Sequence, residues 1–450
     1  MFFRQIESAG LAHYSYMVGE GNEVAVIDPK RDIGVYLEEA RKEGLKIKYI
    51  LETHRNEDYI IGSMELAERT GATIYISGHE DLGHVYGEKI FDGDKLKVGS
   101  LTIQGIHTPG HTLGHMSYGV YEENRENAYM VFTGDCLFMG DLGRTDFYGE
   151  ENLEKMTGLL YDSVFEKLLS LGDEVLVFPA HGAGSSCGDS MEERPYSTLG
   201  YEKAYNPELQ VISKDSFIKD FGRMRIKPRY FEKMERYNVK GAEFVGEEVR
   251  LEPLQIDEAK KQGITIIDAR TKEAYFGGHI PGTLFFSVRN FSTYAGNIID
   301  TDTPVAFLVE GNDTEKLHTL YWYARRIGFE NIKGYIADGN SQWERMIKDL
   351  EPLPTITAEE YLELNSEEFV MLDIRKPEDI SPEDPSEKRV NIPLQNLYKD
   401  YEKLPKNQPI YIICGSGDRS ATAASFLRSK GYDGRVVSGG LLTLKPLLNK

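Results

Sequence analysis

Apolar residues in the first quarter of the chain recur in short blocks that polar and glycine-containing stretches separate. Some blocks are short and rich in β-branched and aliphatic residues, which predicts strands, and others have helical spacing. The predicted strands are 14–19, 23–27, 47–51 and 73–77, and the predicted helices are 33–43 and 64–70. This order predicts an α/β fold, an αββα sandwich, with the functional site at one edge of a sheet.

Strand-like runs are repeatedly followed by a histidine or an aspartate. His54 follows the run 47–51, His111 follows 101–106, Asp135 follows 129–132 and His181 follows 175–178. A side chain at the point where a buried strand enters a loop is well placed for a metal or a reacting group. A single histidine of this kind is more often structural, but the repetition predicts one site at one sheet edge.

The motifs around these residues resemble those of the metallo-β-lactamase superfamily. They are T-H-x-x-x-D from Thr53, T-P-G-H-T around His111, F-T-G-D ending at Asp135 and P-A-H ending at His181. The run 134–147, GDCLFMGDLGRTDF, resembles the persulfide dioxygenase branch in particular. The resemblance covers about the first half of the chain. It implies that His54, His111 and Asp135 hold one Fe²⁺ per chain.

The first motif departs from the superfamily pattern H-x-H-x-D-H at two positions. Asn56 stands at the second histidine and Tyr59 at the last one. An amide and a phenol are poor ligands for the metal pair of the superfamily's hydrolases. The remaining two imidazoles and one carboxylate suit a mononuclear Fe²⁺ with open positions for dioxygen and substrate. Asn56, Asp58 and Tyr59 could still orient these ligands through hydrogen bonds, and Zn²⁺ or loss of the metal are the alternatives.

Further residues near these motifs are candidates for supporting the ligands or the substrate. The resemblance implies that His181 supports the site and does not bind iron. Arg144 either clamps the carboxylate or phosphate of a thiol carrier or forms a structural pair within its loop. Cys187 lies in a glycine-rich loop, where it either carries a persulfide near the metal or is a small buried residue.

A different pattern begins near residue 249 and occurs twice. The runs 264–270 and 275–282 resemble the opening of a rhodanese domain, and 370–375 opens a second copy. Their separation is that of duplicated domains and not of a short repeat. The second copy lacks the Gly-His-Ile-Pro-Gly segment of the first and has the acidic insert 378–387 instead.

The second copy contains a candidate sulfur-transfer site. The apolar run 410–413 leads into the loop Cys414-Gly415-Ser416-Gly417-Asp418-Arg419 and a predicted helix. Successive N–H groups of such a loop form an anion-binding nest, and the positive end of the helix points at the same place. With the nearby charge of Arg419, the loop is predicted to stabilise a thiolate or persulfide on Cys414.

The first copy has Glu310 at the position that aligns with Cys414. A carboxylate cannot accept sulfane sulfur, so we expect this copy to be catalytically silent. The predicted domains are 1–245, metallo-β-lactamase-like; 246–352, silent rhodanese-like; and 353–450, rhodanese with an active-site cysteine. This order resembles persulfide dioxygenase–rhodanese fusions.

Size and composition limit the functional classes. A chain of 450 residues is too long for one ordinary core. Its net charge of -21 argues against nucleic acid or an anionic membrane as a partner. Neither a signal peptide nor an apolar run of about 20 residues is recognisable, which predicts no membrane association. Three separated cysteines suit a reducing cytoplasm. Such fusions often form homo-oligomers, and no stretch is diagnostic of an interface.

These features predict a sulfur-metabolism enzyme. The first domain would oxidise a glutathione- or coenzyme A-like thiol persulfide with dioxygen to sulfite. The Cys414 domain would transfer sulfane sulfur, with sulfite and thiosulfate as the small-molecule partners. The alternatives are a zinc-dependent thioester hydrolase of the hydroxyacylglutathione hydrolase type and a metal-free scaffold fused to an active sulfurtransferase.

Overall fold

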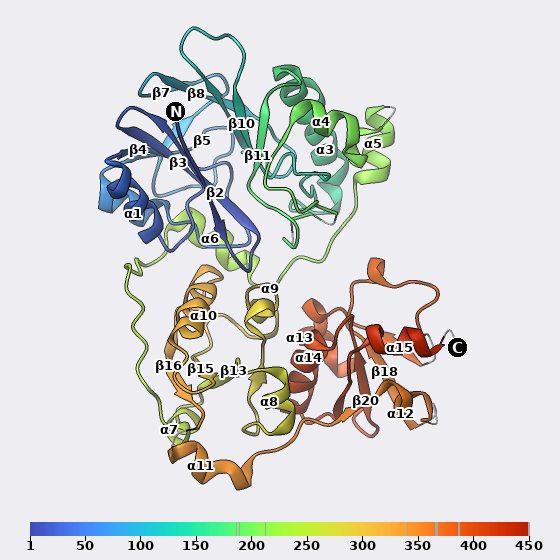
Figure 1. The fold of residues 1–450 in the computed structure, drawn as a ribbon. Coiled ribbons are helices and arrows are strands. Elements are labelled where there is room, and N and C mark those ends of the chain that lie inside the picture. The colour runs from blue at the N-terminus through green and yellow to red at the C-terminus, as the bar shows by residue number, and fades with distance from the viewer. Residues whose placement is uncertain are drawn as a thin grey trace. The chain divides into compact units, whose positions relative to one another are not determined.

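The computed structural model describes residues 1–185, 187–188, 190–211, 213–339, 341–364, 368–385 and 388–448. The chain divides into two compact units (Figure 1). The first unit is Met1–Lys227 with Phe231–Glu248, and the second is Pro228–Tyr230 with Val249–Lys450. The first unit therefore ends close to the predicted boundary at 245. The boundary at 352 falls inside the second unit and stays a prediction.

The first sheet of the first unit has the order β1-β2-β3-β4-β5-β6. Its strands are β1 (Phe2–Ser8), β2 (His13–Glu20), β3 (Glu23–Ile27), β4 (Lys46–Leu51), β5 (Thr73–Ser77) and β6 (Glu88–Ile90). Helices α1 (Gly34–Glu43) and α2 (Ser63–Thr70) contribute Tyr36 and Leu66 to an apolar cluster with residues of these strands. The strands and helices predicted from apolar spacing in this region are thus confirmed.

The second sheet has the order β12-β11-β10-β9-β8-β7. Its strands are β7 (Lys95–Val98), β8 (Leu101–His107), β9 (Met116–Tyr121), β10 (Met130–Gly134), β11 (Leu176–Pro179) and β12 (Ser197–Thr198). Helices α3 (Glu150–Tyr161), α4 (Leu199–Tyr205) and α5 (Lys214–Phe221) lie on its far side in Figure 1, and α6 (Phe231–Lys240) follows. Leu160 of α3 and Phe217 of α5 pack with Val131 and Val177 of the sheet.

The core of the first unit lies between its two sheets. Val18 and Leu51 of the first sheet pack in one cluster with Ile103, Tyr118 and Phe132 of the second. Each such side chain contributes about 1.5–3 kcal/mol when it is fully buried. Helices cover the outer face of each sheet, which gives the four layers of the predicted αββα sandwich (Figure 1).

The second unit contains two sheets whose strands are all parallel. The first has the order β14-β13-β15-β16, with β13 (Thr265–Asp268), β14 (Leu284–Phe285), β15 (Val305–Val309) and β16 (Ile332–Ala337). Its helices are α7 (Ile256–Lys261), α8 (Lys272–Gly277), α9 (Val288–Ile298), α10 (Thr314–Arg326) and α11 (Ser341–Met346). This module is α/β, as expected of the first rhodanese-like copy.

The other sheet has the order β17-β21-β20-β18-β19. Its strands are β17 (Thr355–Ile356), β18 (Val370–Asp373), β19 (Arg389–Asn391), β20 (Ile410–Ile413) and β21 (Gly434–Val437). Its helices are α12 (Ala358–Leu362), α13 (Leu397–Asp400), α14 (Asp418–Ser429) and α15 (Leu441–Leu448). The acidic insert is anchored by Asp384, which accepts from Arg375 at 2.8 Å and pairs with Lys445 at 2.6 Å.

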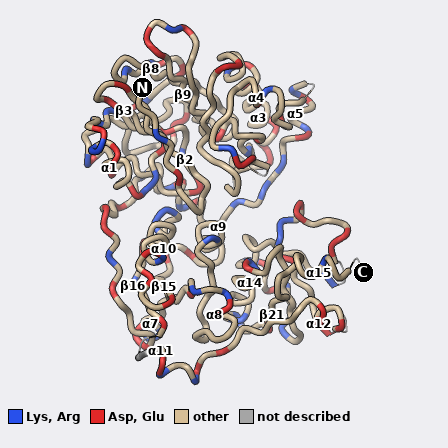
Figure 2. Tube along the Cα trace, viewed as in Figure 1, with Lys and Arg blue, Asp and Glu red and all other residues tan. Residues whose placement is uncertain are grey.

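Among the described residues, no helix is both long and apolar enough to span a bilayer. Acidic and basic residues are interspersed along the trace in Figure 2. A basic run stands out between α5 and α6, where the sequence has Arg223, Arg225, Lys227 and Arg229.

Candidate functional site

The loop after β4 carries the first candidate ligand, His54. The preceding residue, Thr53, donates its N–H to Asp28 Oδ1 at 2.8 Å and its hydroxyl to Asp28 Oδ2 at 2.7 Å. The same hydroxyl oxygen lies 2.9 Å from His54 Nδ1. Because Nδ1 is engaged in this way, the imidazole is held with its Nε2 available to a metal.

His111 and Asp135 reach the same place from the second sheet. His111 follows β8, and its Nδ1 lies 2.9 Å from the carbonyl oxygen of Arg144. Asp135 follows Gly134, which has a φ of 53°, and its N–H donates to His115 Nε2 at 3.0 Å. A Cβ at position 134 would lie 2.5 Å from that nitrogen, so both the backbone conformation and the space require glycine.

The three predicted ligands form one buried cluster. Ligand atoms of His54, His111 and Asp135 lie within 4.8 Å of one another. Asp135 Oδ2 is 3.4 Å from His111 Nε2 and 3.9 Å from His54 Nε2. Within the described residues, neither His111 Nε2 nor Asp135 Oδ2 has a hydrogen-bond partner. Because buried polar atoms normally have partners, these unpaired atoms and this donor set fit a divalent cation.

His181 lies between two carboxylates beside this cluster. Its Nδ1 is 2.7 Å from Asp135 Oδ1, and its Nε2 is 2.9 Å from Asp58 Oδ2. Burial alone lowers the pKa of His181, but the charges of Asp135 and Asp58 outweigh burial and hold that pKa well above its usual range. The ring therefore orients Asp135 through Oδ1, the oxygen that does not face His111. This geometry supports the role that the resemblance gave to His181.

The two residues that depart from the superfamily motif form hydrogen bonds around the ligand loop. Asn56 donates its amide to the carbonyl oxygen of His54 at 3.3 Å. The Tyr59 hydroxyl lies 2.8 Å from His13 Nε2 and donates to the carbonyl oxygen of Asp28 at 3.4 Å. Both side chains thus hold the ligand loop by hydrogen bonds.

Cys187 lies next to the metal cluster. Ligand atoms of Cys187, Asp58 and His181 form a second group within 4.8 Å of one another. The residue is 1% exposed. Burial first, and then the charges of Asp135 and Asp58, raise the pKa of its thiol well above the usual range. Its position is compatible with a thiol that acts near the metal. The raised pKa, however, disfavours the thiolate form of Cys187.

Arg144 forms the structural pair that was the second alternative for it. Its Nε and Nη2 donate to the two carboxylate oxygens of Asp146 at 2.6 and 2.7 Å. Its Nη1 donates to the carbonyl oxygen of Ile226 at 3.2 Å, and the residue is 2% exposed. Because this guanidinium is buried and already hydrogen-bonded to Asp146 and Ile226, it does not bind the carboxylate or phosphate of a thiol carrier.

In the second unit, β20 delivers Cys414 to the N-terminus of α14. The N–H of Gly417 donates to Cys414 Sγ at 3.1 Å, and α14 begins at the next residue. Gly417 has a φ of 94°, a conformation that favours glycine. Of the other loop residues, Ser416 is exposed and Gly415 accepts from the N–H of Leu442 at 3.1 Å. The sulfur is thus placed at the positive end of a helix, as the sequence predicted.

Charged side chains surround this loop, and some come from the preceding module. Arg419 Nη1 donates to the hydroxyl of Tyr294 in α9 at 3.5 Å. Lys272 of α8 donates to Asp418 Oδ1 at 2.9 Å. The hydrogen bond to Asp418 is the main cause of a raised pKa of Lys272, and the charge of Cys414 adds to it. The module without a cysteine therefore contributes to the surroundings of Cys414.

Comparison with known proteins identifies the domains that contain these two sites. Residues 9–181 match the metallo-β-lactamase superfamily, and 253–346 and 357–444 match the rhodanese-like domain. The human protein named persulfide dioxygenase ETHE1, mitochondrial, is 30% identical over 230 residues, which are 50% of this chain and 82% of that protein.

The chain belongs to the metallo-β-lactamase superfamily. A crystal structure of a metallo-β-lactamase from Staphylococcus aureus subsp. aureus COL has 31% identity and a TM-score of 0.67, and covers 75% of this chain and 98% of that one. Hydroxyacylglutathione hydrolase GloC of Haemophilus influenzae is 28% identical over 210 residues, which are 42% of this chain and 88% of that protein. The protein is thus a metallo-β-lactamase domain followed by two rhodanese-like domains.

One residue that holds the ligand loop of the metallo-β-lactamase domain was missed by sequence analysis. Asn238 of α6 donates its amide to the carbonyl oxygens of Asn56 and Tyr59, both at 2.7 Å. Its Oδ1 accepts from the N–H of Ile61 at 3.0 Å, and the side chain is 1% exposed. Asn238 lies outside the segment that matches the superfamily, so no motif indicates it.

Glu57 was also missed. Its carboxylate reaches the ligand cluster: Oε2 lies 3.6 Å from His54 Nε2 and 3.5 Å from His111 Nε2. In the superfamily motif H-x-H-x-D-H this position is unspecified, so the pattern itself assigns it no role. The signal that the sequence offered was the position of the Glu57 carboxylate between two motif positions, Asn56 and Asp58.

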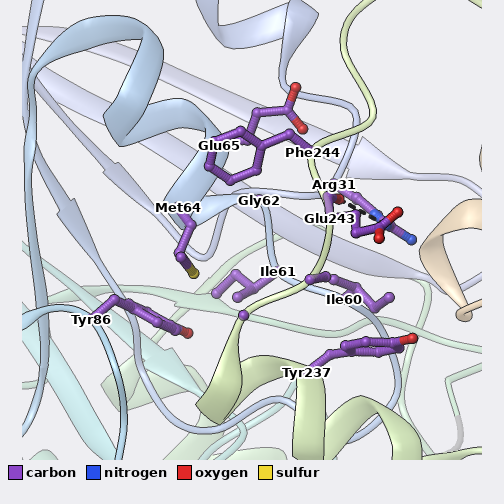
Figure 3. Close-up of a pocket in the computed structure, with 12 residues that line it drawn as sticks. Arg31, Ile60, Ile61, Gly62, Met64, Glu65, Tyr86, Tyr237, Glu243 and Phe244 are labelled. Carbon is purple, nitrogen blue, oxygen red and sulfur yellow. Dashed lines mark hydrogen bonds between the residues drawn. The ribbon is translucent and has the colours of Figure 1, made fainter.

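Figure 3 shows a pocket lined in part by residues that follow the ligand loop, Ile60, Ile61 and Gly62. It is lined by Ile60, Met64, Tyr237 and Phe244 among others, and no candidate metal ligand lines it. Glu65, which also lines it, accepts from the N–H groups of Val245 and Gly246 at 2.9 and 2.8 Å. The pocket therefore lies where the segment after α6 is fastened to α2. A separate small cavity, which includes Glu52, Arg55 and His84 in its lining, contacts the ligand His54.

Proposed function

We propose that the metallo-β-lactamase domain is an iron-dependent persulfide dioxygenase and that the Cys414 domain is a sulfurtransferase. The observation that carries the proposal is the buried cluster of His54, His111 and Asp135, in which His111 Nε2 and Asp135 Oδ2 have no hydrogen-bond partner among the described residues. Two imidazoles and one carboxylate are the donor set of non-haem Fe²⁺ oxygenases. The similarity to human persulfide dioxygenase supports this choice of chemistry.

The side chains around the cluster prepare it for this reaction. When bound, Fe²⁺ supplies the activation of dioxygen. Thr53 and the Arg144 carbonyl group fix the two imidazoles, and His181 fixes Asp135. The burial of the three side chains keeps bulk water away from the cluster. The overall reaction consumes one dioxygen and one water for each persulfide and gives the thiol, sulfite and two protons.

The Cys414 domain moves sulfane sulfur without oxidising it. The Cys414 thiolate attacks the outer sulfur of a persulfide or of thiosulfate, and the original S–S bond breaks as the thiolate or sulfite leaves. A new S–S bond then holds the sulfur on Cys414, beside the Gly417 N–H. Sulfite that attacks this persulfide leaves as thiosulfate and regenerates the thiolate. A glutathione- or coenzyme A-like thiol is the proposed carrier.

Metal analysis and oxygen uptake test the dioxygenase. Protein purified without oxygen is expected to contain about one iron per chain. It is also expected to consume dioxygen when glutathione persulfide is added. Zinc or no metal, together with no uptake, would reject the dioxygenase and leave a sulfurtransferase fused to a repurposed first domain.

A zinc-dependent thioester hydrolase is the second candidate function, and the similarity to hydroxyacylglutathione hydrolase GloC favours it. Its reaction needs no dioxygen. Hydrolysis of lactoylglutathione by the Zn²⁺-loaded protein without oxygen would support the hydrolase. Absence of hydrolysis, with uptake of oxygen by the Fe²⁺ form, would exclude it.

A further inference from the structure

Glu57 presents one carboxylate oxygen to both imidazoles of the metal cluster. Its Oε2 lies 3.6 Å from His54 Nε2 and 3.5 Å from His111 Nε2. Asp135 Oδ2 lies at similar distances, 3.9 and 3.4 Å, from the same two nitrogens. Glu57 is 1% exposed, and its Oε2 has no hydrogen-bond partner among the described residues. The two carboxylates thus occupy equivalent positions relative to the imidazoles.

We propose that Glu57 is a fourth protein ligand of the divalent cation, an inference that rests on the metal centre proposed above. Two donor atoms that each bind one cation at about 2.1 Å are about 3.0 to 3.4 Å apart. The distances from Glu57 Oε2 to the imidazole nitrogens, 3.5 and 3.6 Å, approach this separation. They exceed the range of about 2.7–3.2 Å for an ordinary N–H···O hydrogen bond, so without a cation these contacts are only long ion pairs.

The second oxygen of Glu57 has its own support. Glu57 Oε1 lies 3.4 Å from Arg55 Nη2, and the same nitrogen lies 3.7 Å from Glu235 Oε1. Arg55 therefore holds the carboxylate by one oxygen while the other points at the imidazoles. A side chain positioned from outside in this manner is typical of a metal ligand.

A fourth ligand changes what substrate can do at the centre. Glu57 and Asp135 together balance the charge of a divalent cation. Four protein donors leave two positions of a six-coordinate cation open, in contrast to three positions with His54, His111 and Asp135 alone. The fourth ligand would therefore reduce the number of positions that substrates could occupy.

Cobalt titration of the whole protein tests the fourth ligand. Co²⁺ is added without oxygen to metal-free protein, and affinity is measured by chelator competition while visible absorption reports the coordination. E57A is expected to lower Co²⁺ affinity about 10-fold or more and to change the absorption spectrum. E57Q, which keeps the shape of the side chain, is expected to give a smaller loss in the same direction. E232Q, a change of an exposed carboxylate on α6, is expected to match the wild-type protein.

Wild-type affinity and absorption in both E57A and E57Q would overturn the proposal. If E57A does not fold, E57Q alone decides, because its amide oxygen binds cations more weakly than a carboxylate. The proposed function fails separately. A wild-type protein whose Co²⁺ site depends on Glu57, but whose Fe²⁺ form takes up no oxygen with persulfide, would retain the ligand and reject the dioxygenase. If the Fe²⁺ form takes up oxygen with persulfide but Co²⁺ binding does not depend on Glu57, the dioxygenase is retained and the fourth ligand is rejected.

Discussion

The two rhodanese-like domains share a buried framework but differ in strand number, in the acidic insert and, of most consequence for chemistry, at one loop. In each, a buried Asp-x-Arg pair follows the first central strand: Asp268 Oδ1 accepts from Arg270 Nε at 3.0 Å, and Asp373 Oδ1 accepts from Arg375 Nε at 3.0 Å. In each, a later strand leads into a loop and a helix. The first domain has Glu310 at that loop and the second has Cys414.

In the loop of Glu310, carboxylates of the same domain accept the available hydrogen bonds. The Glu310 carboxylate accepts from the N–H of Thr271 and from Lys316 Nζ, both at 2.5 Å. The N–H of Gly311 donates to Asp338 Oδ1 at 2.7 Å. In the other domain, by contrast, the N–H of Gly417 faces Cys414 Sγ. In the first domain, the carboxylates of Glu310 and Asp338 therefore accept the hydrogen bonds of the loop region. In the second domain, the corresponding loop directs an N–H group at the sulfur atom of Cys414.

Loss of the cysteine is the largest expected effect. C414S is expected to reduce sulfur transfer from thiosulfate to cyanide by about 10³-fold or more, because the hydroxyl is a poor nucleophile for sulfur. Thiocyanate formation measures the rate. E310A is the matched control at the aligned position and is expected to retain the wild-type rate. Persistent transfer in C414S would move the active thiol elsewhere.

A smaller effect is expected at Lys272, which the silent domain contributes to the Cys414 loop. K272A removes one positive charge beside an anionic substrate and is expected to raise the KM for sulfite about 2–5-fold, with a smaller change in kcat. Steady-state thiosulfate formation separates the two constants. K316A changes the lysine of the silent loop and is expected to leave both constants unchanged. If K272A and K316A change the KM for sulfite equally, Lys272 makes no specific contribution to the Cys414 site.

The sequence predicted what depends on short-range patterns. Apolar spacing gave the helices and strands around β4 closely, and strand ends followed by His54, His111 and Asp135 predicted one cluster. The glycine-containing loop before α14 likewise indicated the surroundings of Cys414. These signals extend over a few residues, within which backbone geometry determines where side chains point.

Contacts between distant segments could not be predicted in this way. Asn238 holds the ligand loop across 182 residues of sequence, and Lys272 reaches Asp418 across 146. The pairing of Arg144 with Asp146 was one of two open alternatives, because the exposure of that loop depends on tertiary packing. Long-range partners follow from packing, for which a single sequence has no periodic signal.

The internal anion of the silent loop gives a pH-dependent prediction on stability. Burial raises the pKa of Glu310, but Lys316 and the Thr271 N–H outweigh burial and lower it overall. A lowered pKa stabilises the fold above the ordinary glutamate value and loses this contribution as pH falls through the lowered value. E310Q is expected to lose about 0.5–1 kcal/mol at pH 7, a small value because the side chain is partly exposed.

Scanning calorimetry across pH measures this effect. The difference between E310Q and wild-type protein is expected to shrink as pH falls from the ordinary glutamate pKa through the lowered pKa of Glu310, and to vanish once Glu310 is protonated in the folded protein as well. E315Q, a change on the same segment in a residue of α10, is the control and is expected to show no such pH dependence. A difference that stays constant with pH would exclude the charge of Glu310 as its cause.

The smallest expected effect is the sharpest test of why one domain is silent. E310C placed in the C414S background restores a cysteine to the first loop, yet we expect no gain of sulfur transfer. The N–H of Gly311 is already engaged by Asp338, and the negative charges of Asp338 and Asp313 oppose a thiolate there. Thiocyanate formation by the double variant is compared with that of C414S alone. A substantial gain would show that the missing cysteine alone makes the first domain inactive. If there is no gain, but activity appears after the further change D338N, the cause is the hydrogen bond from the Gly311 N–H to Asp338.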